Sequence, residues 1–272
     1  MNLDNQVVLL TGAAGGIGRA LAGALSGAGC RLALVDRDER GLRETAAALP
    51  QTGRRVSLHV CDLADREALR ALPQAVLHEH DAIHVLVNNA GVGVGGTFEQ
   101  VGEEDFDWLM RVNFHAVVDL TRAVLPVLRR NAAPSRIVNV SSLYGLVSPP
   151  GQTAYSASKF AVRGFSNALR HELRGGSIGV LVVHPGGVST GIADNARAPQ
   201  GMDPAEFDRI RKEKNRLLRM PPAKAARIIV RAIEADKARV IVGFDAKVVA
   251  LLERLMPVSY WRVLEWLMTR RR

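Results

Sequence analysis

A tyrosine and a lysine stand four residues apart in the stretch 155–159, which opens a predicted helix running to about Leu173. Side chains at this spacing lie on one face of a helix, with Cβ atoms about 5–6 Å apart. A free tyrosine titrates near ~10, and a neighbouring cation lowers the pKa of the phenol. The pattern therefore indicates that Tyr155, with Lys159 beside it, exchanges protons near neutral pH. The alternative is a packed aromatic ring next to a solvated charge.

A glycine-rich turn follows the first strand-like segment. The apolar run 7–10 is typical of a parallel strand buried on both faces, and 19–28 has the character of a helix. Between them lie Thr11, Gly12, Gly16, Ile17 and Gly18. Glycines let the backbone approach a pyrophosphate, and the helix N-terminus offers free N–H groups and a partial positive charge. This order of elements predicts a nucleotide site rather than a plain tight turn.

An acidic residue, Asp36, ends the second predicted strand, 31–35, eighteen residues after Gly18. A carboxylate there accepts hydrogen bonds from both ribose hydroxyls of an adenosine and repels a 2′-phosphate. The pattern therefore favours NAD over NADP. Arg37 and Arg40 keep NADP open, because either guanidinium can turn toward a phosphate.

The other predicted strands, 55–61, 82–87, 136–140, 178–184 and 239–242, mostly end in polar or small residues as well. Ligands of open parallel sheets bind outside the carboxyl ends of the strands, so we expect these ends to line one crevice. They carry Asp62, Leu63, Asn88, Asn89, Ala90, Gly91, Ser141, Ser142, Pro185, Gly186, Val188 and Thr190.

Individual residues in this set have more than one interpretation. Asp62 and Leu63 could hold an adenine, and Asp62 is also a candidate N-cap of the helix that begins near Asp65. Asn113, inside the predicted helix 103–130, could be a cap, a solvated side chain or the holder of a water. The two adjacent asparagines at 88–89 are expected to tie neighbouring strands together. His184 is assigned to strand-end packing.

Composition excludes several other classes of protein. The chain has 272 residues, of which 47% are hydrophobic and 23% charged, as in an ordinary globular domain. The net charge is +9, but only 5% of residues are aromatic and no basic cluster is interleaved with them, so we expect no nucleic-acid binding. We expect a cytoplasmic location, because no signal segment precedes residue 6 and no apolar stretch reaches ~18–20 residues. Cys30 and Cys61 are expected to be reduced thiols in or near the core.

Strands and helices alternate with no linker between two cores, which predicts a single α/β domain over 1–244. The predicted helices are 19–28, 39–49, one beginning near Asp65, 103–130, 155–173, 204–218 and 223–235. The stretch 191–222 is rich in Pro, Gly and charged residues, and we expect it to be a lid over the substrate.

The last segment, 245–272, extends beyond this domain. Apolar residues recur at helical spacing from Val248 to Leu255, Pro257 interrupts them, and the chain closes with Arg270 to Arg272. The apolar residues after the proline are Tyr260, Trp261, Leu264, Trp266, Leu267 and Met268. An amphipathic, Trp-bearing, cationic segment is typical of a helix at a membrane surface. The alternative is a helix packed over the pocket mouth or onto a partner subunit.

Together these residues resemble the short-chain dehydrogenase/reductase superfamily over 5–243. The motifs that carry the resemblance are Thr11-Gly12 with Gly16 and Gly18; Asn88-Asn89-Ala90-Gly91; Asn113; Ser142 thirteen residues before Tyr155 with Lys159; and Pro185-Gly186 with Val188 and Thr190. The resemblance implies a Rossmann-type, doubly wound, seven-stranded parallel sheet in a three-layer αβα domain.

The resemblance also implies a reaction. Hydride passes between C4 of a nicotinamide, from NAD or NADP, and a carbon bearing a hydroxyl or carbonyl, with Tyr155 as the general acid/base. Lys159 would bind the nicotinamide ribose and lower the tyrosine pKa, Ser142 would donate a hydrogen bond to the substrate oxygen, and Asn113 would place a water in a proton relay. No metal is implied, and no His/Cys cluster argues for one. The cofactor residues would be Thr11, Gly12, Gly16, Ile17, Gly18, Asp36, Arg37, Asp62, Leu63, Asn89, Ala90, Gly91, Tyr155, Lys159, Pro185, Gly186, Val188 and Thr190.

The candidate pocket residues are mostly apolar or neutral, which favours a hydrophobic alcohol, aldehyde or ketone. They are Val94, Leu143, Tyr144, Pro149, Pro150 and Gln152, with the segment 191–220. By analogy with the family we expect a homodimer or homotetramer formed through 113–130 and 155–173. Two alternatives remain: an NADPH-dependent carbonyl reductase, and a nucleotide-sensing protein of the membrane surface that has no turnover.

Overall fold

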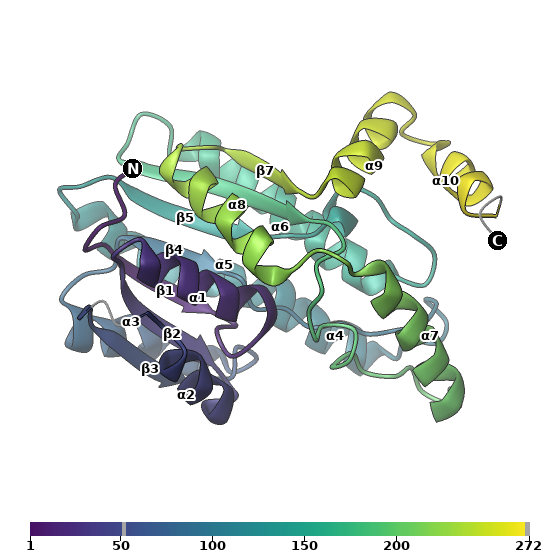
Figure 1. Cartoon of the computed structure of the whole chain (residues 1–272), viewed down its shortest axis with the longest axis horizontal. Helices are drawn as coiled ribbons and strands as arrows, with labels where there is room; N and C mark the ends of the chain where they lie inside the picture. Colours follow the sequence, from purple (N-terminus) through teal and green to yellow (C-terminus); the bar gives the residue numbers. More distant parts are fainter. Residues whose placement is uncertain (51–52, 270–272) are drawn as a thin grey trace.

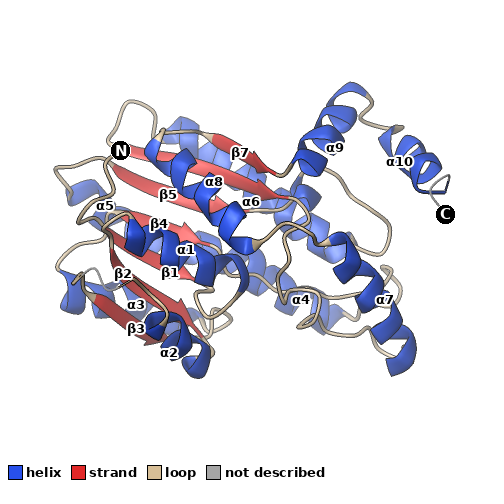
Figure 2. Cartoon of the chain, in the orientation of Figure 1, coloured by secondary structure: helices blue, strands red, loops and turns tan. Residues whose placement is uncertain are grey.

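A parallel sheet forms the centre of the molecule (Figures 1 and 2). The computed structural model describes residues 1–50 and 53–269, and the elements below lie within them. The strands are β1 (Val7–Thr11), β2 (Arg31–Asp36), β3 (Val56–Val60), β4 (Val85–Asn88), β5 (Ser135–Val140), β6 (Ile178–Pro185) and β7 (Arg239–Val242). Their order is β3-β2-β1-β4-β5-β6-β7, and every neighbouring pair is parallel. The predicted seven-stranded Rossmann-type sheet is confirmed.

Helices cover both faces of this sheet. One face carries α1 (Gly16–Gly27), α2 (Glu39–Ala47) and α8 (Pro222–Glu234), and the other carries α3 (Arg66–His80), α5 (Ala116–Arg130) and α6 (Thr153–Glu172). Successive strand residues point to opposite faces, so a central strand that is covered on both faces, such as β1, is apolar over most of its length. In β1, Val8 and Leu10 join the α1/α8 core while Leu9 joins the α3/α5 core.

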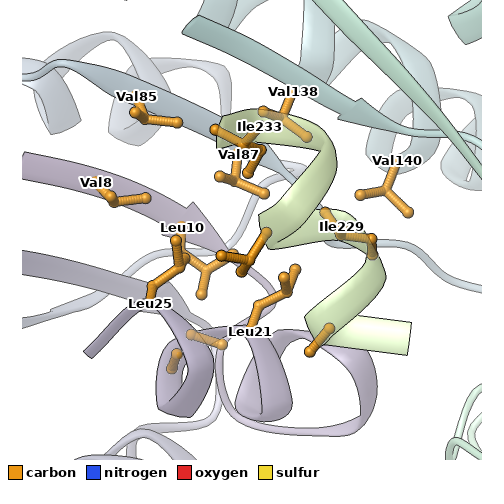
Figure 3. Packing of buried hydrophobic residues seen from close by; sticks show 14 of the residues in the cluster. Val8, Leu10, Leu21, Leu25, Val85, Val87, Val138, Val140, Ile229 and Ile233 are labelled. Carbon is orange, nitrogen blue, oxygen red and sulfur yellow. The ribbon is translucent and has the colours of Figure 1, made fainter. Parts of the chain in front are cut away.

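The core on the α1/α8 side is shown from close by in Figure 3. Leu21 and Leu25 of α1 and Ile229 and Ile233 of α8 are fully buried over the strands. The strand residues beneath them are Val8, Leu10, Val85, Val87, Val138 and Val140. This packing fixes the first turn of α1 relative to the carboxyl ends of β1 and β4.

The long helical run after β4 is interrupted. Regular α-helix holds over α4 (Glu103–Met110) and α5, but Arg111–His115 between them form a π-helical turn. The sequence-based prediction was one uninterrupted helix over 103–130. A π turn accommodates one extra residue per turn and commonly marks a functional position.

The segment after β6 runs back over the loop that follows β4. The Arg197 guanidinium lies 3.5 Å from the centre of the Trp108 ring and pairs with the Asp105 carboxylate at 2.8 Å. A β-bridge joins Val94 to Arg197. The helix that follows, α7 (Pro204–Leu217), has no buried residue. The segment is thus clamped at its start, and its helix is only partly buried.

Two helices close the described chain, α9 (Phe244–Leu255) and α10 (Tyr260–Thr269). They stand beyond β7 at one end of the molecule (Figure 1). Arg270 to Arg272, and the side chains of Leu267 and Met268, lie outside what the structure describes. In the described part of the chain, no helix is both long and apolar enough to cross a bilayer.

Candidate active site

The glycine-rich turn between β1 and α1 packs against the end of β4. Gly12 has a φ of +69°, and a Cβ atom there would lie 2.7 Å from the Cα of Ala90. A Cβ atom on Gly18 would overlap the carbonyl oxygen of Gly12. The Asn89 amide donates to the carbonyl oxygens of Thr11 (2.9 Å) and Gly12 (3.2 Å). Glycine is therefore required at both positions, and the turn is tied to the neighbouring strand.

An open cavity of about 730 Å³ lies beside the first turn of α1. That turn contains no acidic side chain, and its N-cap residue, Gly15, makes no side-chain capping bond, so the N–H groups are left for an anion. Thr190, after β6, reaches the same place, because a Cβ atom on Gly16 would lie 3.2 Å from it. The lining residues are Gly16, Arg19, Ala20, Ser189, Thr190, Gly191, Asp194, Asn215, Leu218, Pro222 and Ala223.

The carboxylate of Asp36 is held at the end of β2 by the glycine-rich turn. Its Oδ2 accepts a hydrogen bond from the backbone N–H of Ala14 at 3.0 Å. Arg37 is exposed beside it. Arg40 is also exposed and lies 3.7 Å from the Glu44 carboxylate. The carboxylate is therefore fixed beside the glycine-rich turn, while both arginines remain at the surface.

The structure at the end of β3 excludes one of the two interpretations of Asp62, that of a helix N-cap. The N-cap of α3 is Asp65, whose carboxylate accepts bonds from the N–H groups of Glu67 (2.9 Å) and Ala68 (3.1 Å). Asp62 instead accepts a bond from Ala64 at 2.9 Å. The capping interpretation of Asp62 is wrong, because the turn 62–65 puts the helix start three residues later.

The paired asparagines at the end of β4 join three strands, as predicted. Asn88 donates to the side-chain oxygen of Asn139 on β5 at 2.8 Å, and Asn89 binds the end of β1 as described above. Both bonds are lateral ties at the carboxyl edge of the sheet. They hold Ala90 and Gly91 between the glycine-rich turn and α6.

Four of the residues singled out in the sequence converge beyond Gly91. A Cβ atom on Gly91 would lie 3.1 Å from Nζ of Lys159 and 3.4 Å from Oδ1 of Asn113. The Lys159 Nζ lies 5.7 Å from the centre of the Tyr155 ring. Ser142, at the end of β5, hydrogen-bonds the Tyr155 side chain. Elements far apart in the sequence thus bring an amide, a hydroxyl, a phenol and an amine to one place.

Asn113 is completely buried within the π-helical turn, so it is not a solvated side chain. Its Oδ1 accepts a bond from the Val92 N–H at 2.8 Å, and its Nδ2 donates to the Val92 carbonyl at 3.0 Å and to the Ser158 hydroxyl at 3.1 Å. The amide therefore joins the loop after β4 to the α6 helix. It caps no helix.

The two serines after β5 have different surroundings. Ser141 is buried, and its hydroxyl donates to the backbone carbonyl of Lys159 at 2.8 Å. The hydroxyl of Ser142 accepts a bond from the Tyr144 N–H at 3.1 Å and faces Tyr155. The Tyr144 ring meets the Tyr155 ring edge-on, with centres 6.0 Å apart. Of the two serines, Ser142 is the one at the cluster.

Burial dominates the protonation of this cluster. Desolvation raises the pKa of Tyr155 to about 12, and the hydrogen bond from Ser142 opposes that rise. Desolvation also lowers the pKa of Lys159 to about 8. The sequence-based expectation is that Lys159 lowers the tyrosine pKa, and loss of water around the phenolate acts in the opposite direction. Tyr155 is a protonated phenol at neutral pH.

His184 makes a contact that sequence reasoning missed. It is fully buried, and its Nδ1 lies 2.9 Å from the carbonyl oxygen of Ser142. Burial lowers its pKa to about 4, so the ring is neutral and Nδ1–H donates to that carbonyl. The sequence feature that could have indicated this contact is the position of His184 near the end of β6, because β6 pairs with β5 just before Ser142.

The residues present fit a dinucleotide. The first turn of α1 has no side-chain cap and no acidic residue, which suits a pyrophosphate, and Asp36 presents a carboxylate near the turn. No group of three or more His, Cys, Asp or Glu side chains that could hold a metal occurs within residues 1–50 and 53–269.

Comparison with known families gives the class. Residues 6–201 match the model of the short chain dehydrogenase family. The chain belongs to the short-chain dehydrogenase/reductase family and is an NAD(P)-using oxidoreductase.

Two relatives have similar sequences. A protein of Mycobacterium tuberculosis named as an oxidoreductase, SadH, is 40% identical over 264 residues, which cover 96% of this chain and 95% of that protein. A protein of Bacteroides thetaiotaomicron, named 3-ketodihydrosphingosine reductase, is 37% identical over 193 residues, 71% of this chain and 68% of that protein.

Two solved structures are similar and contain a cofactor. A family member from Burkholderia phymatum in complex with NAD is 29% identical, with a TM-score of 0.87 over 93% of this chain and 94% of that one. A metagenomic member in complex with NADP is 30% identical, with a TM-score of 0.71 over 89% of this chain and 98% of that one.

Proposed function

We propose that this protein interconverts an apolar alcohol with its ketone or aldehyde, and that Tyr155 is the general acid/base. The observation that carries the proposal is the convergence of Tyr155, Lys159, Ser142 and Asn113 beyond Gly91. Bound NAD(P) supplies a hydride acceptor in one direction and a hydride donor in the other. The chain's own groups bind the substrate oxygen and move its proton.

Each of the four residues has a role in this proposal. Tyr155 is protonated in the free site, so it can donate a proton to a carbonyl oxygen during reduction and take one back during oxidation. The Ser142 hydroxyl binds the same oxygen while charge develops on it. Lys159 carries its charge in most molecules at pH 7 and offers it to the phenolate and to the nicotinamide ribose. Asn113 holds the loop after β4 and the α6 helix together behind the lysine and places a water in the proton relay.

We propose an apolar substrate because the side chains around Tyr155 are mostly apolar. Val94 packs in one cluster with Tyr155, and Leu143 and Tyr144 lie in the neighbouring cluster. The Bacteroides relative is named as a reductase of 3-ketodihydrosphingosine, which supports a ketone as the substrate. We propose that the lid over this substrate is 191–222.

The test is turnover of a series of aliphatic secondary alcohols and ketones, followed by nicotinamide absorbance. Tyr155→Phe should lower kcat by about 10²–10⁴-fold, the usual contribution of general acid/base catalysis. Tyr144→Phe is the matched control, because it removes a phenol hydroxyl from the ring next to Tyr155. It should retain most of the activity. Equal activity of both variants, or turnover of polyols alone, would contradict the proposal.

We further propose NAD as the preferred cofactor. The support is the Asp36 carboxylate, which is fixed by the Ala14 N–H at the end of β2. Arg37 beside it keeps an NADPH-dependent carbonyl reductase as the second candidate. Measuring the affinities of NADH and NADPH for wild type and for Asp36→Ala separates these two candidates. Loss of the carboxylate should weaken the binding of NADH and strengthen the binding of NADPH. A wild type that prefers NADPH supports the second candidate.

The remaining features of the proposal concern organisation. We propose one catalytic domain, 1–244, followed by an amphipathic helical extension, 245–272. By analogy with the family, α5 and α6 pair two copies into a homodimer, or four into a homotetramer. Analytical ultracentrifugation of the full chain tests the oligomeric state.

A further inference from the structure

Helix α9 has two apolar faces, and only one of them is packed. Ala246 and Ala250 are buried, and Ala250 packs against Leu146 and Val147 beside the active-site loop. The side opposite carries four exposed residues, Phe244, Val248, Leu251 and Leu255. At 3.6 residues per turn these four fall within an arc of roughly 60°. They form a continuous apolar stripe directed away from the domain.

The stripe continues past the end of α9. Val258, in the turn before α10, is 93% exposed, and Phe244 and Leu255 are 82% and 70% exposed. We call the whole set the C-terminal apolar surface; its members are Phe244, Val248, Leu251, Leu255, Met256 and Val258. Contiguous exposed apolar residues of this kind mark an interaction surface. Because α9 and α10 project beyond β7, a flat partner can reach them (Figure 1).

Basic residues lie along one side of the stripe. Lys247 and Arg254 are both exposed, and on the helix they adjoin the apolar residues on the same flank. The acidic residues of α9 lie elsewhere: the Asp245 carboxylate accepts a bond from Gly187, and Glu253 is partly buried on the packed side. The edge of the C-terminal apolar surface is therefore cationic.

From this arrangement we propose that the C-terminal apolar surface binds an anionic lipid bilayer. Apolar side chains would enter the boundary between headgroups and acyl chains, and the flanking cations would meet anionic headgroups. A second copy of the chain fits less well. Pairing two such stripes brings the cationic flanks of two chains together, each with a net charge of +9.

This binding mode places the active-site loop near the lipid. The Oη of Tyr260, at the start of α10, accepts a bond from the Ser148 N–H at 2.9 Å. Leu143, Tyr144 and Tyr260 pack in the same cluster. One helix diameter, about 10 Å, thus separates the bilayer from the loop that carries Tyr144.

The experiment is co-sedimentation of the full chain with vesicles of phosphatidylcholine alone and of phosphatidylcholine with phosphatidylglycerol. Wild type should bind the anionic vesicles at least tenfold more tightly than the neutral ones, and added salt should weaken that binding. The double variant Leu251→Glu/Leu255→Glu should lose at least tenfold in vesicle affinity. Its control is Leu217→Glu, an equally exposed leucine on α7, which should bind as wild type does.

A second pair of variants tests the charge. Lys247→Glu/Arg254→Glu should lose binding to anionic vesicles, while Arg227→Glu/Arg231→Glu, with the same change in net charge on the exposed side of α8, should lose much less. Vesicle binding needs no turnover, so this test stands apart from the proposed reaction.

Three results would overturn the proposal. Wild type could fail to bind either vesicle, or the stripe variant could bind as well as its control. Alternatively, sedimentation velocity could show that wild type is an oligomer and the stripe variant a monomer, while wild type does not bind vesicles. That result would assign the surface to a second copy of the chain.

Discussion

The hydrogen bond from His184 to the carbonyl of Ser142 predicts a measurable effect on turnover. In His184→Leu the carbonyl keeps its bond from the Gly145 N–H at 3.0 Å but loses the one from the ring. Loss of one buried hydrogen bond costs about 1 kcal/mol when the acceptor keeps another partner. If that loss is expressed in the placement of Ser142 at the transition state, kcat should fall roughly fivefold to tenfold.

The choice of replacement makes this prediction specific. An asparagine at 184 presents its amide nitrogen where the ring has Nδ1, and a glutamine presents it where the ring has Nε2. We therefore expect His184→Asn to recover most of the lost kcat and His184→Gln to resemble His184→Leu, with KM changed less than kcat in each. Steady-state kinetics with a secondary alcohol and saturating cofactor measures the series.

The pH profile separates positioning from a general loss of structure. The bond from Ser142 lowers the pKa of Tyr155, so a displaced serine should move the apparent pKa in the kcat profile for oxidation upward. His184→Leu and His184→Gln should show this shift, and His184→Asn should show little of it. A merely loosened fold would lower kcat at all pH values alike.

Stability gives an independent check on the protonation state of His184. Its pKa falls from 6.5 when exposed to about 4 when folded, so the unfolded chain binds the extra proton in that interval. Wild type should be fully stabilised by this residue above pH 6.5 and lose up to about 3 kcal/mol as pH falls toward 4. His184→Asn has no imidazole to titrate, so its free energy of unfolding should fall less between pH 7.5 and pH 5 than that of wild type. Urea unfolding at the two pH values measures the difference. Two results would refute the role of His184 in positioning Ser142. One is a His184→Leu variant with the kcat and pH profile of wild type, and the other is an equal kcat for His184→Asn and His184→Gln.

Two further predictions concern stability. A Cβ atom on Gly145 would lie 2.7 Å from the carbonyl oxygen of Lys159, so Gly145→Ala should destabilise the fold by about 1–3 kcal/mol in urea titration, whereas Gly23→Ala on α1, with open space around it, should stabilise by about 0.5–1 kcal/mol. Arg136 is buried and bonds Asp236, which lowers the aspartate pKa; the ion pair therefore stabilises above the unfolded pKa near ~4 and fades as pH falls through the folded one. Asp236→Asn should cost about 1–2 kcal/mol at pH 7, a modest figure because the aspartate is mostly exposed, and less at pH 3 by the same titration; an equal cost at both pH values would contradict the assignment.

The architecture was predictable because its sequence pattern is local. Each central parallel strand buried on both faces is a short apolar run, and Val7 to Leu10 and Val85 to Val87 have this pattern, which favours a strand when glycine or polar residues follow directly. The glycine-rich turn and the polar strand ends were also predictable, since an α/β sheet assembles them at one edge. Chain order and residue type contain this information.

The features that were missed depend on tertiary geometry. Hydrophobic periodicity does not distinguish an α-helix from one with a single inserted residue, so the π-helical turn at Asn113 was invisible. Asp62 and Asp65 are equally good caps by composition, and only the path of the turn selects Asp65. The partner of His184 follows from strand register, which joins positions forty-two residues apart.

The pKa of Tyr155 is the clearest case of a competition that sequence cannot weigh. Spacing on a helix reveals the neighbouring cation but not the amount of water that folding removes from both groups. In the structure that removal raises the phenol pKa to about 12 and lowers the lysine pKa to about 8, so each group is pushed toward its neutral form. The same low-dielectric surroundings strengthen every hydrogen bond and charge directed at the phenolate. Proton exchange at Tyr155 therefore depends on where Ser142 and Lys159 are held, which explains why so many buried contacts, from His184 to Asn113, are devoted to fixing the loop and helix that carry them.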